Sequence, residues 1–560
     1  MFSRACEAAR AIPRAVIATI VVSATAVGLA ACSSSDSSSE SSAPAAPVST
    51  DFFGYMVASR LVTTNASSAF GAASNSQVLS GRLYPAAYVP GPDGQLIPNS
   101  DLISAEEIPA TAAGQRQIHY TISSHATYSD DVPVTCEDFL LAYTAGSMPS
   151  TFGSHAPLVN EIDDLQCEAG SKDFTVILKQ DQGDRWKYLF GPGTVLPSHV
   201  IAQKVGMTQE ELVSALQSWD PSRVADIART WRFGFSLADF DASMQVSYGP
   251  FVIDHVGDSG EVVLKRNDSY YGDPALLDTL VVWPNSTDAA HLVAAGVLRV
   301  ADSTGGTPEW LDRNVDDNPY VVDEQVGELT DTLLLAEDGL FASVENRQAF
   351  AACVDQKKLA GVSSKVSGME VPAVTEHALR HDDPIAKQLD GVTSAHLGTD
   401  IPAASALGGT TIKVGYLGPD ERYAAMVESL RATCAQAGIN VEDASSDFMS
   451  ATYLEPDEDT GVPTIDAFLG AVDPMTEYAT VDARIGNVEA LKKAEEKLWS
   501  DVPAIPIAAQ PRTFVMDQAV THVVPYTGLS GIGWNMDRWS LGDDPAAGTE
   551  SPAAATTPEK

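Results

Sequence analysis

An alternation of strand-like and helix-like segments predicts an α/β fold. The clearest case lies between residues 411 and 441. Thr411–Tyr416 has the apolar pattern of a buried strand, and five later side chains recur on one helical face: Tyr423, Met426, Val427, Leu430 and Cys434. Gly438 stands where a helix commonly ends, and Ile439–Val441 begins a second strand. A strand, a helix and a strand in this order predict a βαβ unit, and therefore a parallel sheet covered by helices.

The first 31 residues have the pattern of a signal peptide. Arginines at positions 4, 10 and 14 precede an apolar segment, Ala15–Ala31, that is short and rich in small residues. Leu29-Ala30-Ala31-Cys32 resembles the bacterial lipobox, in which a peptidase cuts before a lipidated cysteine. This resemblance implies a mature chain that begins at lipidated Cys32 on the extracytoplasmic face of the cell membrane, followed by a Ser-rich tether over residues 32–50. The alternative is an ordinary secretory signal in which this cysteine is incidental.

The mature chain is long and strongly acidic. Residues 32–560 suffice for two or three domains and a large core. Without residues 1–31 the chain has 31 Lys and Arg against 74 Asp and Glu, a net charge of −43. Such a surface repels phosphate backbones and anionic lipid head groups, so nucleic acid is a poor candidate partner, whereas cationic or zwitterionic ligands remain open. The acidity is equally explained by the solubility of an exported protein.

Four cysteines remain after Cys6 and Cys32, and none has CxxC or zinc-site spacing. In an oxidising compartment they predict two disulfides, for which three pairings exist. Pairing sequence neighbours, Cys136 with Cys167 and Cys353 with Cys434, keeps each bridge within one expected domain. A helix is expected over Val344–Leu359, so the second bridge would clamp two helices together. Buried free thiols are the alternative.

Six short motifs follow one another between residues 120 and 507. They are Tyr120–Ile122 with Ser129–Asp138, Leu196–Val200, Tyr248–Phe251, Asn267–Gly272, Asn346–Phe350 with Asp355, and Val502–Ile507. In this order they resemble the signatures of family 5 extracellular solute-binding proteins, the oligopeptide, dipeptide and nickel receptors of ABC importers. Each motif alone is weak, but their shared order is specific.

The motif residues also have structural interpretations. Thr135 and Asp138 have the spacing of a helix N-cap, and Gly249-Pro250 leads into a hairpin of Phe251–His255 and Val262–Arg266.

The histidines do not form a metal pattern. His199 has no second histidine at ligand spacing and is expected in a loop or the core. His377 and His381 lack a third ligand, so a solvated helical turn is expected there instead of a metal site. The GxSxG, HExxH and GxxxxGK motifs are absent, so the sequence indicates no enzyme and implies no cofactor.

The resemblance implies a two-lobed periplasmic-binding-protein-like fold of class II, of the large peptide-receptor type, with the ligand between the lobes. Lobe I is expected over residues 51–80, 228–305 and 505–541, with an inserted subdomain over 81–227. Lobe II is expected over 306–504, and a disordered tail over 542–560.

In peptide-binding members of the family, a G-W-x-A-D-Y segment supplies an aspartate for the ligand's ammonium group. The matching stretch here is Asp466–Met475, which makes Asp473 the candidate ligand-binding residue, although the tryptophan is missing. Two further positions depart from the family pattern. Asp131 replaces a glycine, and Arg299 stands where an aspartate is usual.

A second resemblance concerns the cysteine motifs around residues 353 and 434 and the stretch Asp473–Tyr478. These are similar to actinobacterial LpqW-type lipoproteins, for which the implied role is in phosphatidylinositol mannoside and lipoglycan biosynthesis. The implied partner is then a membrane mannosyltransferase instead of an ABC permease. Both resemblances imply a lipid-anchored monomer, and the sequence alone leaves transport and regulation open.

Overall fold

The computed structural model describes residues 53–542 apart from 92–94, 314, 316–317, 458–459 and 479–486. The expected signal peptide, the tether with its lipidation site Cys32, and the expected tail beyond Gly542 lie outside the described residues. Among the described residues, no helix is long and apolar enough to span a membrane.

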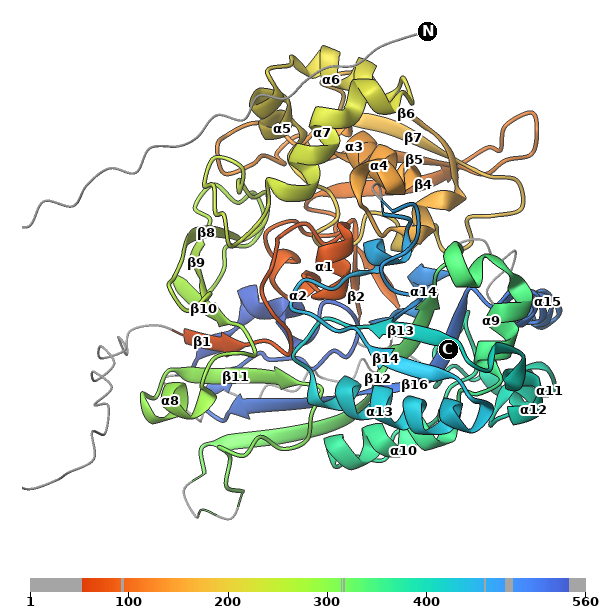
Figure 1. The fold of residues 1–560 in the computed structure, drawn as a ribbon. Helices are drawn as coiled ribbons and strands as arrows, with labels where there is room; N and C mark the ends of the chain where they lie inside the picture. The colour runs from red at the N-terminus through yellow and green to blue at the C-terminus, as the bar shows by residue number, and fades with distance from the viewer. Residues whose placement is uncertain are drawn as a thin grey trace, which may run out of the picture. The chain divides into compact units, whose positions relative to one another are not determined.

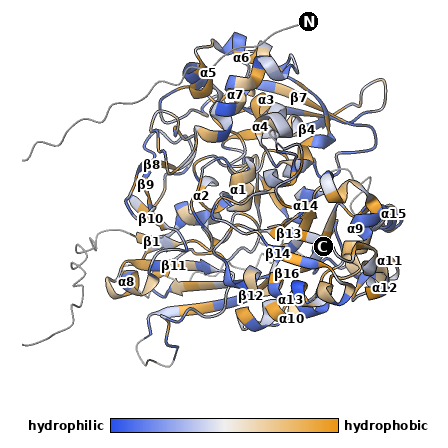
Figure 2. Ribbon diagram, viewed as in Figure 1, coloured by the Kyte–Doolittle hydropathy of each residue, from blue (hydrophilic) through white to orange (hydrophobic). Residues whose placement is uncertain are grey.

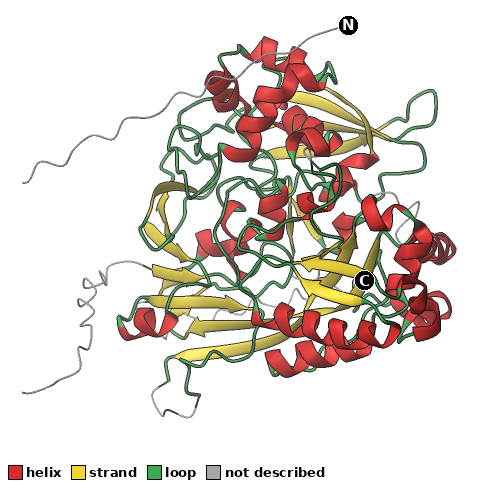
Figure 3. Ribbon diagram, viewed as in Figure 1, coloured by secondary structure: helices red, strands yellow, loops and turns green. Residues whose placement is uncertain are grey.

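Ten strands form one mixed sheet, in the order β14-β13-β15-β12-β16-β11-β1-β10-β9-β8 (Figures 1 and 3). Their bounds are β1 Phe53–Met56, β8 Phe251–Val256, β9 Val262–Arg266, β10 Thr279–Trp283, β11 Leu298–Ser303, β12 Tyr320–Leu335, β13 Thr411–Gly415, β14 Asn440–Asp443, β15 Ala467–Val472 and β16 Ala504–Asp517. Smaller sheets are formed by β4 Ile103–Ile108, β5 Gln117–Ile122, β7 Asp173–Leu178 and β6 Ile162–Gln166, by β2 Tyr88–Pro90 and β3 Leu96–Pro98, and by β17 Val520–Thr521 and β18 Ser540–Leu541.

The helices pack around these sheets. Their bounds are α1 Ala69–Ala73, α2 Gln77–Ser80, α3 Cys136–Ser147, α4 Pro149–Phe152, α5 Ser198–Val205, α6 Gln209–Leu216, α7 Pro221–Phe233, α8 Ala289–Ala294, α9 Val344–Ala351, α10 Gln356–Ser367, α11 Asp390–Thr393, α12 Ile401–Ala404, α13 Glu421–Cys434, α14 Pro474–Glu477 and α15 Val488–Asp501. Helices α3 to α7 gather beside the four-stranded sheet, and α10 and α13 lie together against the far end of the ten-stranded sheet (Figure 1).

The predicted βαβ unit is present. Strands β13 and β14 pair in parallel, with Thr411 opposite Asn440. Between them α13 buries Met426 and Leu430 against the sheet, and Gly438 follows with a φ of 77°, a left-handed conformation that suits glycine. The α/β prediction is confirmed for this unit.

Two strands run through both halves of the large sheet. The first residues of β12, including Tyr320, pack in an apolar cluster with Met56, whereas its last residues, including Leu333, belong to a different core. Strand β16 pairs with β12 over most of its length and also with β11. A register shift between Val326 and Thr330 interrupts β12 between the two regions. The part of the sheet that packs with Met56 and the part that packs with Leu333 therefore share strands β12 and β16.

Two large cores flank these strands. One contains residues from Phe53 to Val300 together with Phe514 and Trp539, and it is shared by the expected lobe I and its subdomain. The other contains residues from Leu333 to Ala508. Figure 2 shows apolar residues along the strands of the large sheet and on the helix faces that cover them.

The structure contains both disulfides in the neighbour pairing. Cys136 and Cys167 are joined with their Cα atoms 5.7 Å apart, and Cys353 and Cys434 with theirs 5.0 Å apart. Both separations are normal for disulfides. All four cysteines are buried.

The prediction of a single helix over Val344–Leu359 is wrong, because parts of two helices occupy this stretch. Helix α9 ends at Ala351 and α10 begins at Gln356. The side chain of Asp355 accepts a hydrogen bond from the Lys358 N–H at 3.0 Å and so caps a new helix. The second disulfide therefore joins the connection between two helices, not a helix, to the end of α13.

The helix cap at Thr135 and the hairpin after Gly249-Pro250, both expected from the sequence, are present in the structure. The Thr135 N–H donates to the Asp138 carboxylate at 3.0 Å at the start of α3, as a capping arrangement requires. Strands β8 and β9 form the expected antiparallel hairpin. Asp131, which replaces the family's glycine, has a φ of 65°, so this turn does need the left-handed conformation that glycine adopts without cost.

Candidate ligand-binding cavity

A cavity of about 280 Å³ lies between the two large cores. One side is built by α1, α2, β2 and the loop around Phe190, and the other by β12, β15 and the start of α13. Leu329, beside the register shift of β12, also lines it. Small-molecule sites are typically concave, mostly apolar and placed between domains, so this cavity is the candidate site.

The cavity wall is mainly apolar. Aliphatic and aromatic side chains come from both sides, among them Val78, Tyr88, Leu158, Leu334, Phe468 and Tyr526. Residues 66–73 add small side chains, which leave room next to α1. Such a wall favours a ligand with an apolar body whose few polar groups meet specific partners.

Asp473, the candidate from the sequence, lines this cavity but is already paired. Arg380 donates from Nε to Oδ1 at 3.2 Å and from Nη2 to Oδ2 at 2.8 Å. The Met475 N–H donates to Oδ1 as well, at 3.0 Å, because Asp473 caps α14. The third guanidinium nitrogen of Arg380 lies 2.7 Å from Glu328 on β12. The structure thus places Asp473 in the cavity wall with its charge neutralised by Arg380.

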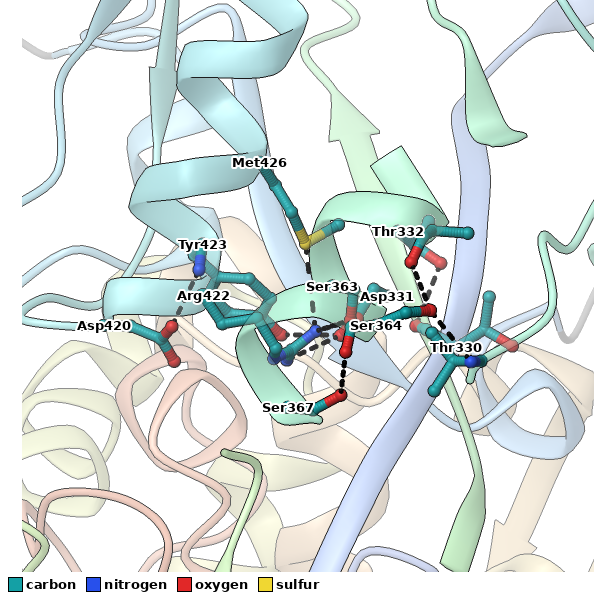
Figure 4. Close-up of polar contacts among 12 residues, drawn as sticks. Thr330, Asp331, Thr332, Ser363, Ser364, Ser367, Asp420, Arg422, Tyr423 and Met426 are labelled. Carbon is teal, nitrogen blue, oxygen red and sulfur yellow. Dashed lines mark hydrogen bonds and ion pairs between the residues drawn. The ribbon is translucent and has the colours of Figure 1, made fainter. Parts of the chain in front are cut away.

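A buried polar network lies behind the wall of the cavity, and sequence reasoning missed it (Figure 4). Asp331 of β12 is fully buried and receives two hydrogen bonds from Arg422 and one from the Tyr423 hydroxyl, the last at 3.0 Å. Ser363 of α10 also accepts from Arg422, at 3.3 Å. The signal in the sequence is the polar run Thr330–Thr332 directly before the apolar run Leu333–Leu335.

Asp420 lies between this network and the cavity. It caps α13, because its Oδ1 accepts the Tyr423 N–H at 2.8 Å. Burial raises the pKa of Asp420, the nearby Arg422 lowers it, and the Asp331 carboxylate raises it further. The net effect is a raised pKa, which indicates a carboxylate that is poorly compensated in the described structure.

Polar contacts made by His155, Arg185 and Arg60 connect the two sides of the cavity. His155 lies 2.9 Å from Glu477, and Arg185 donates to the backbone oxygens of Ala378 at 2.5 Å and Pro474 at 2.8 Å. A third, more exposed pair joins Arg60 and Asp447 at 3.7 Å. Burial lowers the pKa of His155, but the Glu477 carboxylate more than offsets this, and the net shift is upward.

The histidines serve structural roles, which differ from the expected ones. His377 is not in a solvated helical turn. It is buried, bonds to Glu495 at 2.9 Å and packs on Trp499, because α15 supplies both partners from a distant part of the chain. His199 lies in the first turn of α5 instead of a loop or the core, and it contacts Asp130 at 3.0 Å.

Within the described residues, one group has metal-ligand spacing, namely Cys136, Glu137 and Cys167. Both sulfurs of this group are joined in the disulfide, so neither is a thiolate ligand.

Comparison with protein families identifies the architecture. Residues 103–467 match the model of the bacterial extracellular solute-binding proteins, family 5. The chain belongs to this family. Family 5 members are solute-binding receptors, and the mixed α/β, two-lobed fold expected from the sequence is confirmed.

Relatives of this family 5 chain include mycobacterial lipoproteins. An uncharacterized lipoprotein of Mycobacterium tuberculosis is 30% identical over 537 residues, which cover 87% of this chain and 92% of the relative. Among solved structures, the oligopeptide-binding protein of Thermus thermophilus in complex with a pentapeptide has a TM-score of 0.66 and 15% identity, with 88% of this chain and 96% of that chain covered. The periplasmic EDTA-binding protein EppA has a TM-score of 0.62 and 17% identity over the same shares.

Arg299, the second departure from the family 5 pattern, has a structural partner. Its guanidinium lies 2.5 Å from Asp517 at the end of β16. This ion pair joins β11 to β16.

Proposed function

We propose that this protein is an extracytoplasmic solute-binding lipoprotein of an ABC importer and that it takes small peptides or similar solutes. The observation that carries the proposal is the largely apolar cavity between the two cores. Lobe II, residues 306–504, would close on lobe I, residues 51–80, 228–305 and 505–541, and on its subdomain, residues 81–227. The long strands β12 and β16 would act as the shared connection.

The comparisons support this proposal at the level of the family. A structural neighbour from Thermus thermophilus is an oligopeptide-binding protein, and the mycobacterial relatives are called lipoproteins. Membrane attachment through Cys32 remains a prediction, because this residue lies outside the described part of the chain. Replacing Cys32 with Ala should yield uncleaved or shed protein without lipid. Unchanged membrane retention together with an unchanged mature mass would contradict the anchor.

Ligand binding in the cavity can be tested with a variant in which a larger side chain fills the cavity. Ala72 on α1 lines the cavity, and Ala225 on α7 is an exposed helical alanine away from it. Isothermal titration calorimetry with pooled dipeptides to pentapeptides should show binding by wild type and by Ala225→Trp, but at least tenfold weaker binding by Ala72→Trp. Equal binding by all three proteins would place the ligand elsewhere. No binding by wild type would remove the peptide-receptor proposal.

A ligand ammonium at Asp473, expected from the family resemblance, stays a prediction. Arg380 already occupies both carboxylate oxygens of Asp473, so the ammonium would have to displace the guanidinium.

The same ion pair favours a second candidate function, a scaffold or regulator of phosphatidylinositol mannoside and lipoglycan biosynthesis that contacts a membrane mannosyltransferase. Arg380 neutralises Asp473, the aspartate expected to bind a ligand ammonium. This pairing suits a protein that keeps the receptor fold but has lost peptide binding. A deletion strain separates the two functions. Reduced uptake of labelled peptides with unchanged lipoglycan supports import, whereas changed lipoglycan content with normal uptake supports the regulatory role.

A further inference from the structure

The charged side chains that line the cavity are almost all paired. Seven such residues line it: Arg60, His155, Lys187, Asp420, Asp473, Glu477 and Arg512. Five of them take part in ion pairs with each other or with Asp302, Arg380 and Asp447. Lys187 and Asp420 are left, since neither has an ion-pair partner within 4.0 Å among the described residues.

The two remaining charges differ in their surroundings. Lys187 is exposed, and its ammonium lies 5.9 Å from the centre of the Tyr88 ring, so water hydrates this charge. Asp420 is half-buried and lines the cavity together with Leu417, Pro419 and Tyr423. A charge that is partly removed from water and has no counterion is destabilising, because the low-dielectric surroundings do not replace the lost hydration.

The nearest guanidinium does not neutralise Asp420. Arg422 directs its Nη atoms to Asp331, and Figure 4 shows this pair within the network. Asp420 instead accepts hydrogen bonds from backbone N–H groups, from Tyr423 at 2.8 Å and from Arg422. Asp331 and Asp420 therefore lie near one guanidinium that pairs with Asp331, and one net negative charge remains at the cavity wall. Asp473 differs from Asp420 because both of its carboxylate oxygens accept hydrogen bonds from Arg380.

We propose that Asp420 receives the protonated amine of a ligand whose remaining body is apolar. This inference rests on the proposed function, because it assigns a ligand class to the same cavity. A protonated amine there would supply the missing counterion, while the aliphatic and aromatic wall would surround the apolar part.

The test uses a charge-removing variant that keeps the helix cap. Asn caps helices as well as Asp does, so Asp420→Asn removes the charge with little effect on α13. Asp400→Asn is the matched control, because Asp400 caps α12 through the Ala403 N–H at 3.1 Å but is exposed and does not line the cavity. Thermal unfolding of both variants verifies that they fold.

The probes are the dipeptide Leu-Leu and its N-acetyl derivative, which differ in the charge of the amine. Calorimetry should give wild type and Asp400→Asn a preference of about tenfold or more for the free amine. In Asp420→Asn the preference should fall to about twofold or less, since the loss affects the free-amine probe alone.

The outcomes separate this inference from the proposed function. If wild type binds Leu-Leu and Asp420→Asn keeps the full preference for the free amine, the role of Asp420 is refuted while the cavity remains a peptide site. Loss of the preference in Asp473→Asn instead would assign the amine to Asp473 and also refute the inference. If wild type binds neither probe, the peptide-receptor function and the amine site both fail.

Discussion

Arg380 donates two hydrogen bonds to the carboxylate of Asp473, from Nε at 3.2 Å and from Nη2 at 2.8 Å. The two residues are 93 positions apart in the chain. This bidentate pair lies in the wall of the cavity, where the family resemblance would place an aspartate for a ligand's amine. The candidate ligand contact is therefore part of an internal ion pair, and a substitution of Asp473 should affect the stability of the fold.

Asp473→Asn should lower the free energy of unfolding by about 1–3 kcal/mol, because it leaves the Arg380 guanidinium with Glu328 as its remaining carboxylate. Asp226→Asn on the exposed face of α7 is the control and should change stability by less than about 0.5 kcal/mol. Urea unfolding at neutral pH measures both. An unchanged stability combined with weaker peptide binding would show that Asp473 serves the ligand instead.

The two disulfides should stabilise the fold by about 2–4 kcal/mol each, mainly by restricting the unfolded chain. The bridges close stretches of 31 and 81 residues, so the double replacement Cys353→Ala with Cys434→Ala should cost at least as much as that of Cys136 with Cys167. Denaturant unfolding gives the two costs. Non-reducing peptide mapping checks the pairing, and four free thiols or a cross-pairing in native protein would contradict it.

Glu161 should make stability depend on pH. It is 4% exposed, one of its carboxylate oxygens lacks a hydrogen-bond partner, and burial raises its pKa to about 7 although the Arg185 guanidinium lowers it in part. The folded protein thus holds this proton more tightly than the unfolded chain. The stabilisation that protonated Glu161 gives the fold is complete below a pH of about 4.5 and is lost as the pH rises through about 7.

Glu161→Gln should consequently raise the free energy of unfolding by about 2–3 kcal/mol at pH 8 and change it little at pH 4. Glu106→Gln on the exposed face of β4 is the control at both pH values. Chemical unfolding across this range gives the difference curve. The assignment is wrong if the gain is the same at both pH values.

Asp131→Gly should stabilise the protein by about 0.5–1 kcal/mol, because Asp131 has a φ of 65° and glycine adopts this conformation without a Cβ clash. The matched substitution Asp226→Gly in α7 should destabilise by about the same amount, since glycine weakens a helix interior. Differential scanning calorimetry compares the two variants with wild type. A loss of stability in Asp131→Gly would mean that its carboxylate does more than occupy the turn.

Local features of this chain could be predicted because they depend on near neighbours. The apolar spacing between Tyr423 and Cys434, with Gly438 after it, specified a helix between two strands, and the same unit is found in the structure. The hairpin of β8 and β9 and the cap at Thr135 follow from turn and capping chemistry within a few residues. The helix break before Asp355 was missed, since the apolar pattern continues through it and only the capping side chain reveals it.

The sequence by itself determined the α/β class and the family motifs, and it favoured the neighbour pairing of cysteines that the structure contains. The tertiary structure alone decided the chemistry of the cavity. His377 is buried because α15 supplies Glu495, and Asp473 is neutralised because Arg380 folds against it. Among the described residues Asp420 has no ion-pair partner within 4.0 Å, because the Arg422 guanidinium pairs with Asp331. Whether a charge is compensated depends on side chains far away in the sequence, and only the packed fold brings them within hydrogen-bond distance.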